Sequence, residues 1–234
     1  MPNKYHALIP ARGGSVGILK KNLAEIGGKS LVARKVISAI NCAEIDRIFV
    51  SSDDQDTLIE ARKFGAIGLK RNYEASTNSA TAYEMVFDFL SNELGCTLPA
   101  RDYIIYLQPT SPFCNSQHLA EAIEISKMNP TRSVVSINKV HSPFEKLVKI
   151  QDGFLESVVH GDLSIAANRQ DLTEIYSPNG AIYIFQIRYF LNFESFPVIG
   201  SLPYVMSTID SIDIDSSADL KLARIIEESR IYGD

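Results

Sequence analysis

The stretch YHALIPARGGSVGILKKN occupies residues 5–22. Its first part, Tyr5 to Ile9, is a short apolar run that predicts a buried β-strand. A proline and a glycine-rich loop follow, and the next apolar pattern, from Ser30 to Asn41, predicts a helix. A buried strand that leads through a glycine loop into a helix is typical of an α/β domain.

Strand and helix patterns alternate outward from this unit. We expect buried strands at 47–51, 103–107, 133–137 and 181–185, and helices at 52–64, 79–94, 119–128 and from Ser216 to the last residues. For the second helix, Ser52 with Gln55 resembles a capping box, and Gly65 is the expected stop. Continuous apolar strands between helices predict an α/β fold with a largely parallel sheet flanked by helices on both faces.

Residues 139–178 interrupt this alternation with polar linkers and a hairpin expected around Gly153. The segment is short for an independent core, so we interpret residues 1–234 as a single domain with 139–178 as an insertion.

Ligands of such sheets bind beyond the carboxyl ends of the strands, where the polar loops 10–22, 51–54 and 108–114 fall. In the first loop, glycines permit close approach of the backbone to a ligand, and Arg12, Lys20 and Lys21 add positive charge. The loop matches neither GxxxxGK[ST] nor GxGxxG, which disfavours P-loop ATPases and dinucleotide dehydrogenases. Two glycines alone also fit a simple turn, but together with three cations they favour phosphate binding.

A second candidate is the acidic segment before the final helix. Asp213 and Asp215 are two residues apart, so in an extended segment both carboxylates point to the same side. Such a pair suits Mg²⁺, which takes one or two carboxylates together with substrate phosphates. The alternative is that Asp215 complements the helix N-terminus while Asp213 is solvated. We expect this helix to be capped by Ser216 and Asp219 and to bury apolar side chains at Leu222, Ile225 and Ile226.

Composition excludes several classes of protein. The chain has 234 residues and a net charge of −5 without a basic tract, which is a poor match to nucleic-acid binding. Its three cysteines form no CxxC pair, so a disulfide scaffold or zinc ribbon is not expected. No apolar run has the length of a signal peptide core or a membrane span, and we expect a cytoplasmic protein. The four histidines, at 6, 118, 141 and 160, form no pair at metal-ligand spacing.

Several segments then converge on one family, in the same order along nearly the whole chain. They are IPARGGSVGILKKN at 9–22, FVSSDD at 49–54, LQPTSP at 107–112, NRQDL at 168–172, PNGAIYI at 178–184 and DSIDID at 210–215. With them the chain resembles CMP-sialic acid synthetases (N-acylneuraminate cytidylyltransferases), within the nucleotide-diphospho-sugar transferase fold. The resemblance implies a Rossmann-like, mixed but mostly parallel seven-stranded sheet, and a homodimer built through the insertion at 139–178.

The resemblance also implies an activity and a site. The activity is transfer of CMP from CTP to the anomeric hydroxyl of a sialic acid, with release of pyrophosphate and with Mg²⁺ as the metal. For CTP it implies the loop residues Arg12, Ser15, Lys21 and Asn22, then Arg71 and the backbone near Ala80 and Thr81. For the acidic sugar it implies Gln108, Arg169 and Lys146, the last from the partner subunit. For the metal it implies Asp213 and Asp215.

The chain departs from the family pattern at four positions. Val16 stands where a lysine is usual, Ser177 and Cys114 stand where arginines are frequent, and Asn78 stands where aspartate is common. Each lost charged hydrogen bond to a phosphate would cost about 1.5–3 kcal/mol, unless Lys20 supplies the missing charge. Two alternatives therefore remain open. One is a cytidylyltransferase for another nonulosonic acid (legionaminic or pseudaminic) or for 3-deoxy-octulosonate, and the other is a catalytically weak CTP-binding paralogue.

Overall fold

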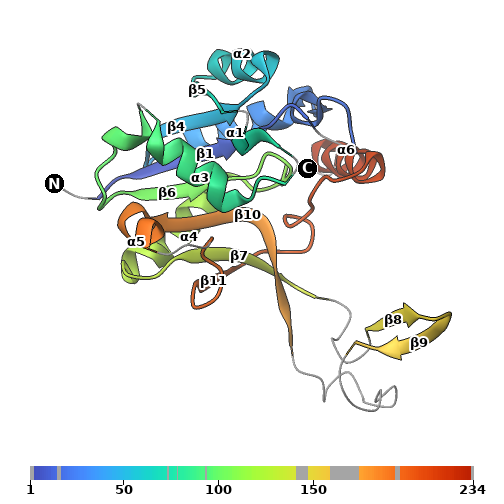
Figure 1. Ribbon diagram of the computed structural model, residues 1–234. Helices are drawn as coiled ribbons and strands as arrows, with labels where there is room; N and C mark the ends of the chain where they lie inside the picture. The colour runs from blue at the N-terminus through green and yellow to red at the C-terminus, as the bar shows by residue number, and fades with distance from the viewer. Residues whose placement is uncertain are drawn as a thin grey trace.

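A seven-stranded sheet organises the protein, in the strand order β11-β7-β10-β6-β1-β4-β5. The computed structural model describes residues 3–14, 17–72, 74–77, 79–92, 94–140, 147–158, 174–192 and 196–232. The strands of the sheet are β1 (Tyr5–Pro10), β4 (Ile45–Ser52), β5 (Ile67–Lys70), β6 (Tyr103–Tyr106), β7 (Val134–Lys139), β10 (Tyr176–Gln186) and β11 (Leu202–Val205). Figure 1 shows this sheet as the twisted centre of the chain.

The pairing of the strands confirms a mixed, mostly parallel sheet. β1 lies between β4 and β6 and is parallel to both, β5 is parallel to β4, and β11 is parallel to β7. β10 is antiparallel to both of its neighbours, β6 and β7. Because β1, β4 and β6 run in the same direction, the loops that follow them meet at one edge of the sheet.

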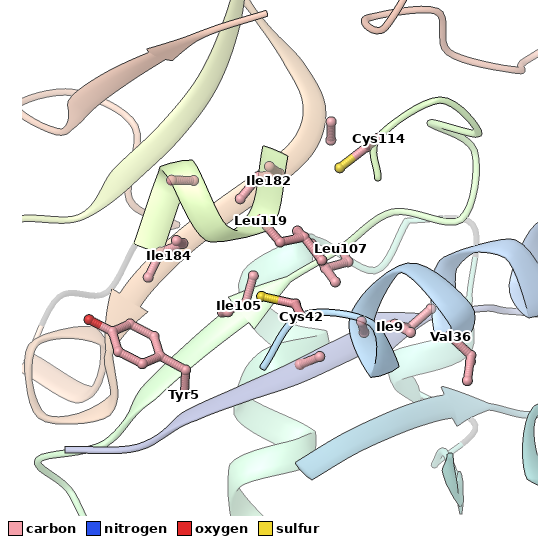
Figure 2. Close-up of a cluster of buried hydrophobic side chains, with 14 of the residues drawn as sticks. Tyr5, Ile9, Val36, Cys42, Ile105, Leu107, Cys114, Leu119, Ile182 and Ile184 are labelled. Carbon is pink, nitrogen blue, oxygen red and sulfur yellow. The ribbon is translucent and has the colours of Figure 1, made fainter. Parts of the chain in front are cut away.

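Helices cover both faces of the sheet. They are α1 (Leu31–Ile40), α2 (Gln55–Lys63), α3 (Ala82–Ser91), α4 (Ser116–Met128), α5 (Ile187–Asn192) and α6 (Ser217–Tyr232). Side chains of α1 and α4 pack in one core cluster with Ile9, Ile105 and Ile182 (Figure 2). Side chains of α3 and α5 pack in a second cluster with Leu8 and Ile104. Neighbouring residues of β1 and β6 thus enter opposite clusters, as the alternation of side chains along a strand requires.

Two helix ends differ from the sequence prediction. The N-cap of α2 is Asp54, whose carboxylate accepts from the Thr57 amide at 3.0 Å, while the Ser52 hydroxyl accepts from the Asp54 amide. The predicted cap at Ser52 is therefore wrong, since β4 extends through that residue. α3 is shorter than 79–94 because a capping box between Thr81 and Glu84 starts it at Ala82.

The buried face of α6 also differs from the prediction. Leu222 and Ile225 are exposed, and Leu220 and Ala223 are the buried apolar side chains among those described on the helix. They pack, with the partly buried Ile226, in a third cluster that contains Ile26, Leu31, Phe113 and Ile214. The predicted cap is confirmed, since the Ser216 hydroxyl accepts from the Asp219 amide and the Asp219 carboxylate accepts from the Ser216 amide.

The hairpin expected around Gly153 is present. β8 (Val148–Gln151) and β9 (Phe154–Ser157) pair antiparallel, and the turn between them has positive φ at Asp152 and Gly153. In Figure 1 the hairpin stands away from the sheet. β10 begins at Tyr176 and pairs there with the end of β7. Among the described residues, no helix combines the length and the apolar character needed to cross a bilayer.

Candidate active site

A cleft of about 550 Å³ opens at the edge of the sheet where β1 and β6 end. It contains every described residue that the sequence analysis assigned to CTP, to the sugar or to the metal: Arg12, Lys21, Asn22, Arg71, Ala80, Thr81, Gln108, Asp213 and Asp215. Ser15, Lys146 and Arg169, as well as Val16 and Asn78, lie outside the described residues. The loop at 51–54 does not line the cleft, but Ser51 accepts hydrogen bonds from Arg71, which does.

Arg71 gives the cleft a buried positive charge. Only 6% of its surface is exposed, and its guanidinium donates to the Ser51 hydroxyl at 3.0 Å and to the Ser51 carbonyl at 2.6 Å. Burial lowers the pKa of Arg71, because a buried cation has lost its hydration. Since both acceptors are neutral oxygens of β4, the charge of Arg71 is left to attract an electron-rich ligand in the cleft.

The glycine-rich loop holds two more cations at the cleft. Arg12 donates to the Thr77 carbonyl at 3.0 Å, and Asn22 donates to the Arg12 carbonyl at 2.8 Å, so these contacts fix the loop at both ends. Lys21 donates to the Ile214 carbonyl at 2.9 Å and forms an ion pair with Asp215 at 3.3 Å. The loop and the acidic segment are therefore joined across the cleft.

Lys20 does not supply the charge that Val16 lacks. Its backbone is in the left-handed region with φ 51°, and its amino group pairs with Asp56 on α2 at 2.7 Å. Ser177, on β10, is exposed and is not part of the cleft lining. The suggestion that Lys20 reaches the phosphates is therefore wrong.

Asp213 and Asp215 have different surroundings on the same side of the cleft. Asp215 is 79% exposed in its side chain, whereas Asp213 is largely buried, and no group among the described residues bonds to its buried Oδ1. Burial raises the pKa of Asp213, the Thr110 side chain lowers it through a hydrogen bond, and the charge of Asp215 raises it. The alternative with a solvated Asp213 is therefore wrong. The carboxylate that accepts from the amides at the start of α6 is Asp219, not Asp215.

The donor set fits Mg²⁺. Two carboxylates line the same cleft, and one of them has a buried oxygen without a partner among the described residues, as a hard cation needs. Within the described part of the chain, no group of three or more His, Cys, Asp or Glu side chains is arranged to hold a metal ion. Such a site would leave most coordination positions to phosphate and water, which is the usual arrangement for Mg²⁺.

Two glycines allow close approach of segments around the cleft. A Cβ atom on Gly17 would lie 2.3 Å from the Asp215 carbonyl oxygen, so the glycine loop and the acidic segment touch through backbone. Gly180 has φ +78°, and a Cβ atom there would lie 2.4 Å from Oε1 of Gln108. Larger residues at either position would displace a group that lines the cleft.

The cleft also contains residues that sequence reasoning missed, among them Thr77, Tyr106 and Thr110. Thr77 contributes its backbone carbonyl, and any residue type could do this, so the sequence holds no signal for it. Tyr106 belongs to an apolar strand run and was assigned to the core, where burial raises its pKa to about 12. Thr110 lies inside the motif LQPTSP, two residues after the predicted Gln108. Its position in the same motif was the signal that could have identified it as a cleft residue.

Comparisons with known proteins extend this picture. A family profile described as "Cytidylyltransferase" matches residues 6–227. The N-acylneuraminate cytidylyltransferase of Escherichia coli O18:K1:H7 is 31% identical over 98% of this chain and 54% of its own length. The CMP-N,N'-diacetyllegionaminic acid synthase of Legionella pneumophila is 29% identical over 95% of each chain.

Among solved structures, a CMP:2-keto-3-deoxy-manno-octonic acid synthetase complexed with CTP superposes with a TM-score of 0.73. The superposition covers 97% of this chain and 100% of the other, at 14% sequence identity, and it supports the fold alone. The chain spans about half the length of the Escherichia coli relative. With a profile match over nearly all of its residues, the chain belongs to the cytidylyltransferase family.

Proposed function

We propose that this protein transfers CMP from CTP to the anomeric hydroxyl of a sialic acid (N-acylneuraminate) and releases pyrophosphate. The observation that carries the proposal is the charge arrangement in the cleft. Arg12, Lys21 and Arg71 line it together with Asp213 and Asp215, and one Asp213 oxygen is buried without a partner. Cations that hold phosphates beside carboxylates that hold a metal form the arrangement that phosphoryl transfer requires.

Each cation has a separate place in this proposal. Arg12 and Lys21 belong to the glycine-rich loop and would hold the phosphates that leave as pyrophosphate. The Lys21 ammonium already lies 3.3 Å from Asp215, so it would touch both the acidic pair and the phosphates. Charge on the leaving phosphates grows during the transfer, and fixed cations at that point lower the barrier.

The base and ribose would lie toward Arg71, Ala80 and Thr81. The amides of Ala80 and Thr81 already donate, to the Thr77 carbonyl and the Glu84 carboxylate. Of the two carbonyls, that of Thr81 already accepts from the Met85 amide at 3.1 Å, so this segment would offer the Ala80 carbonyl rather than an amide donor to the ligand. The amino group of cytosine is a donor that such acceptors suit, whereas uracil has an acceptor in the same place. The arrangement favours CTP over UTP.

Asp213 and Asp215 would hold Mg²⁺ against the CTP phosphates. When bound, the metal would supply positive charge that lowers repulsion between the phosphates and the incoming hydroxyl. Thr110 holds the Asp213 side chain by a hydrogen bond, and its carbonyl accepts from the Ile214 amide at 2.9 Å. The loop after β6 thus fixes the acidic pair in place before any ligand arrives.

The sugar would lie on the Gln108 side of the cleft, where a Cβ atom on Gly180 would collide with the Gln108 amide. A second substrate class has specific support. The Legionella relative is a CMP-N,N'-diacetyllegionaminic acid synthase with 29% identity over nearly its full length, close to the 31% of the first relative. Legionaminic acid is therefore the alternative substrate to test beside N-acetylneuraminic acid.

The test is pyrophosphate release from CTP with Mg²⁺, with and without each acidic sugar. We expect release only when a sugar is present, and loss of at least 100-fold in Asp213→Asn, because the amide cannot supply an anionic metal ligand. Asp210→Asn is the matched control, since Asp210 belongs to the same segment but bonds to Ser207 and Arg230. Bound CTP without release for any acidic sugar would contradict transfer and favour the catalytically weak paralogue.

We further propose that the β8–β9 hairpin mediates a homodimer. Val148, Ile150 and Leu155 share one face of the hairpin, and Ile150 and Leu155 are 78% and 71% exposed. Phe154, which is 74% exposed, lies on the opposite face, where it pairs with Gln151. Exposed apolar side chains in a small hairpin are typical of an interaction surface. We expect Ile150→Asp to halve the mass measured by light scattering, and Gln151→Asp, on the opposite face, to leave it unchanged. A monomeric wild-type protein at micromolar concentration would contradict the dimer.

A further inference from the structure

One side of α1 contacts the back of the loop that follows β6. Arg34 donates to the Pro112 carbonyl at 3.4 Å. The single proton of the Ser38 hydroxyl is shared between the Arg34 carbonyl at 3.0 Å and the Cys114 carbonyl at 3.2 Å. Between them, the Lys35 ammonium donates to the Ser111 carbonyl at 2.8 Å and to the Cys114 carbonyl at 3.3 Å. The back of the loop is thus held by the side chains of a single helix.

The front of the same loop lines the cleft with Gln108, Pro109 and Thr110. Thr110 is joined to the acidic segment in two ways, since its carbonyl accepts from the Ile214 amide and its side chain bonds to Asp213. A short piece of chain therefore separates the Lys35 ammonium from the groups that contact substrate and metal in the proposed function.

Lys35 is an unusual residue for the place it occupies. It is 1% exposed, and the acceptors of its hydrogen bonds are neutral carbonyls. A buried ammonium without a hydrogen-bonded carboxylate costs free energy of folding, because it has lost its hydration. Burial lowers the pKa of Lys35 and the charge of Arg34 lowers it further, while the charge of Asp213 and the Cys114 thiol raise it. A side chain that served only to fill the core would be better as an apolar residue.

We infer that Lys35 is a positioning residue for the transfer reaction: its ammonium fixes the Ser111 and Cys114 carbonyls and thereby holds Gln108 and Thr110 in register with Asp213. The inference rests on the proposed function, because it assigns the purpose of the loop to that reaction. Phe113 and Cys114, at the end of the loop, are buried in the core (Cys114 is labelled in Figure 2), so a shift at the back of the loop is transmitted to its front.

The test compares Lys35→Met, which keeps an unbranched chain of similar length without charge or donors, with Ser38→Ala. The control removes the neutral hydroxyl that is shared between the Arg34 carbonyl and the same Cys114 carbonyl, and it leaves the ammonium in place. For Lys35→Met we expect an unchanged or higher Tm, a kcat lower by roughly 10- to 100-fold, and a KM for CTP within about twofold of the wild type. For Ser38→Ala we expect a kcat within about twofold of the wild type.

A second readout does not depend on turnover. The Ser111 and Cys114 amides bond within the loop, to the Gln108 and Ser111 carbonyls, and their hydrogen exchange should become faster in Lys35→Met. If that variant does not fold, Lys35→Gln replaces it, since its shorter amide cannot reach both carbonyls. A kcat near that of the wild type in the folded Lys35 variant, unchanged exchange, or an equal fall of kcat in Ser38→Ala would overturn the inference. An inactive wild-type protein would instead contradict the proposed function.

Discussion

Replacement of Gly180 by alanine tests the sugar side of the cleft. Gly180 has φ +78°, where an alanine costs about 1–2 kcal/mol in backbone strain. For a domain of this size that cost lowers Tm by about 2–8 °C. The new Cβ atom would also lie 2.4 Å from Oε1 of Gln108, well inside van der Waals contact, so the Gln108 amide must move. A displaced hydrogen-bonding group costs about 1–2 kcal/mol in binding, or roughly 5- to 30-fold.

The assay is steady-state pyrophosphate release with the sugar and CTP varied separately. We expect the KM for the sugar to rise by roughly 5- to 30-fold in Gly180→Ala, while the KM for CTP stays within about twofold. Gly28→Ala is the matched control, because Gly28 has φ +71° but no atom within 4 Å of the added Cβ. It should lose a similar amount of stability without any change in the KM for the sugar. An unchanged sugar KM in Gly180→Ala, or equal kinetic changes in both variants, would refute the assignment of Gln108.

Three further predictions concern other parts of the molecule. Gly17→Ala places a Cβ atom 2.3 Å from the Asp215 carbonyl and should raise the Mg²⁺ concentration for half-maximal rate by about 10-fold; an unchanged titration would contradict the contact. Arg71→Met should raise the KM for CTP by about 10- to 150-fold, and a smaller rise in a folded variant would exclude Arg71 from the nucleotide site. Burial lowers the pKa of His6 below its unfolded value of about 6.5, so its stabilising contribution is full above that pH and is lost as the pH falls. The Tm of the wild-type protein should therefore fall between about pH 7 and 5, and the Tm of His6→Asn should fall less over the same range. An equal fall of Tm in both proteins would refute this role of His6.

Much of the sheet and the position of the cleft could be predicted from the sequence. In an α/β protein, a short apolar run such as Tyr103 to Leu107 is typical of a strand that is covered on both faces, and these residues are buried. The loops after such strands must then lie at one edge. Motif resemblance supplied the residues in those loops, and every one that is described lines the cleft.

Packing choices between similar patterns could not be predicted. In α6, Leu222 and Ile225 carry more apolar surface than Ala223, so hydrophobicity selects the wrong face. The small Ala223 is buried because the helix lies close to Ile26 and Ile214, a tertiary constraint without a local signal.

Contacts to backbone carbonyls could not be predicted from the sequence either. The Thr77 carbonyl holds Arg12, and the carbonyls of Ser111 and Cys114 hold Lys35, irrespective of the side chains at the accepting positions. A lysine in the middle of an apolar helix pattern is read as a surface residue, yet Lys35 is buried. Its partner is a loop distant in sequence, so the role of Lys35 emerges only in three dimensions.

The most direct test of the central claim follows the α-phosphorus of CTP. The wild-type protein is incubated with Mg²⁺, with CTP labelled at the α-phosphate, and with either N-acetylneuraminic or legionaminic acid. The products are then separated, and their masses are measured by mass spectrometry. The account predicts label in a CMP-sugar, formed in equal amount with pyrophosphate and lost in Asp213→Asn. Label that stays in CTP, or appears only in free CMP without a sugar adduct, would contradict it.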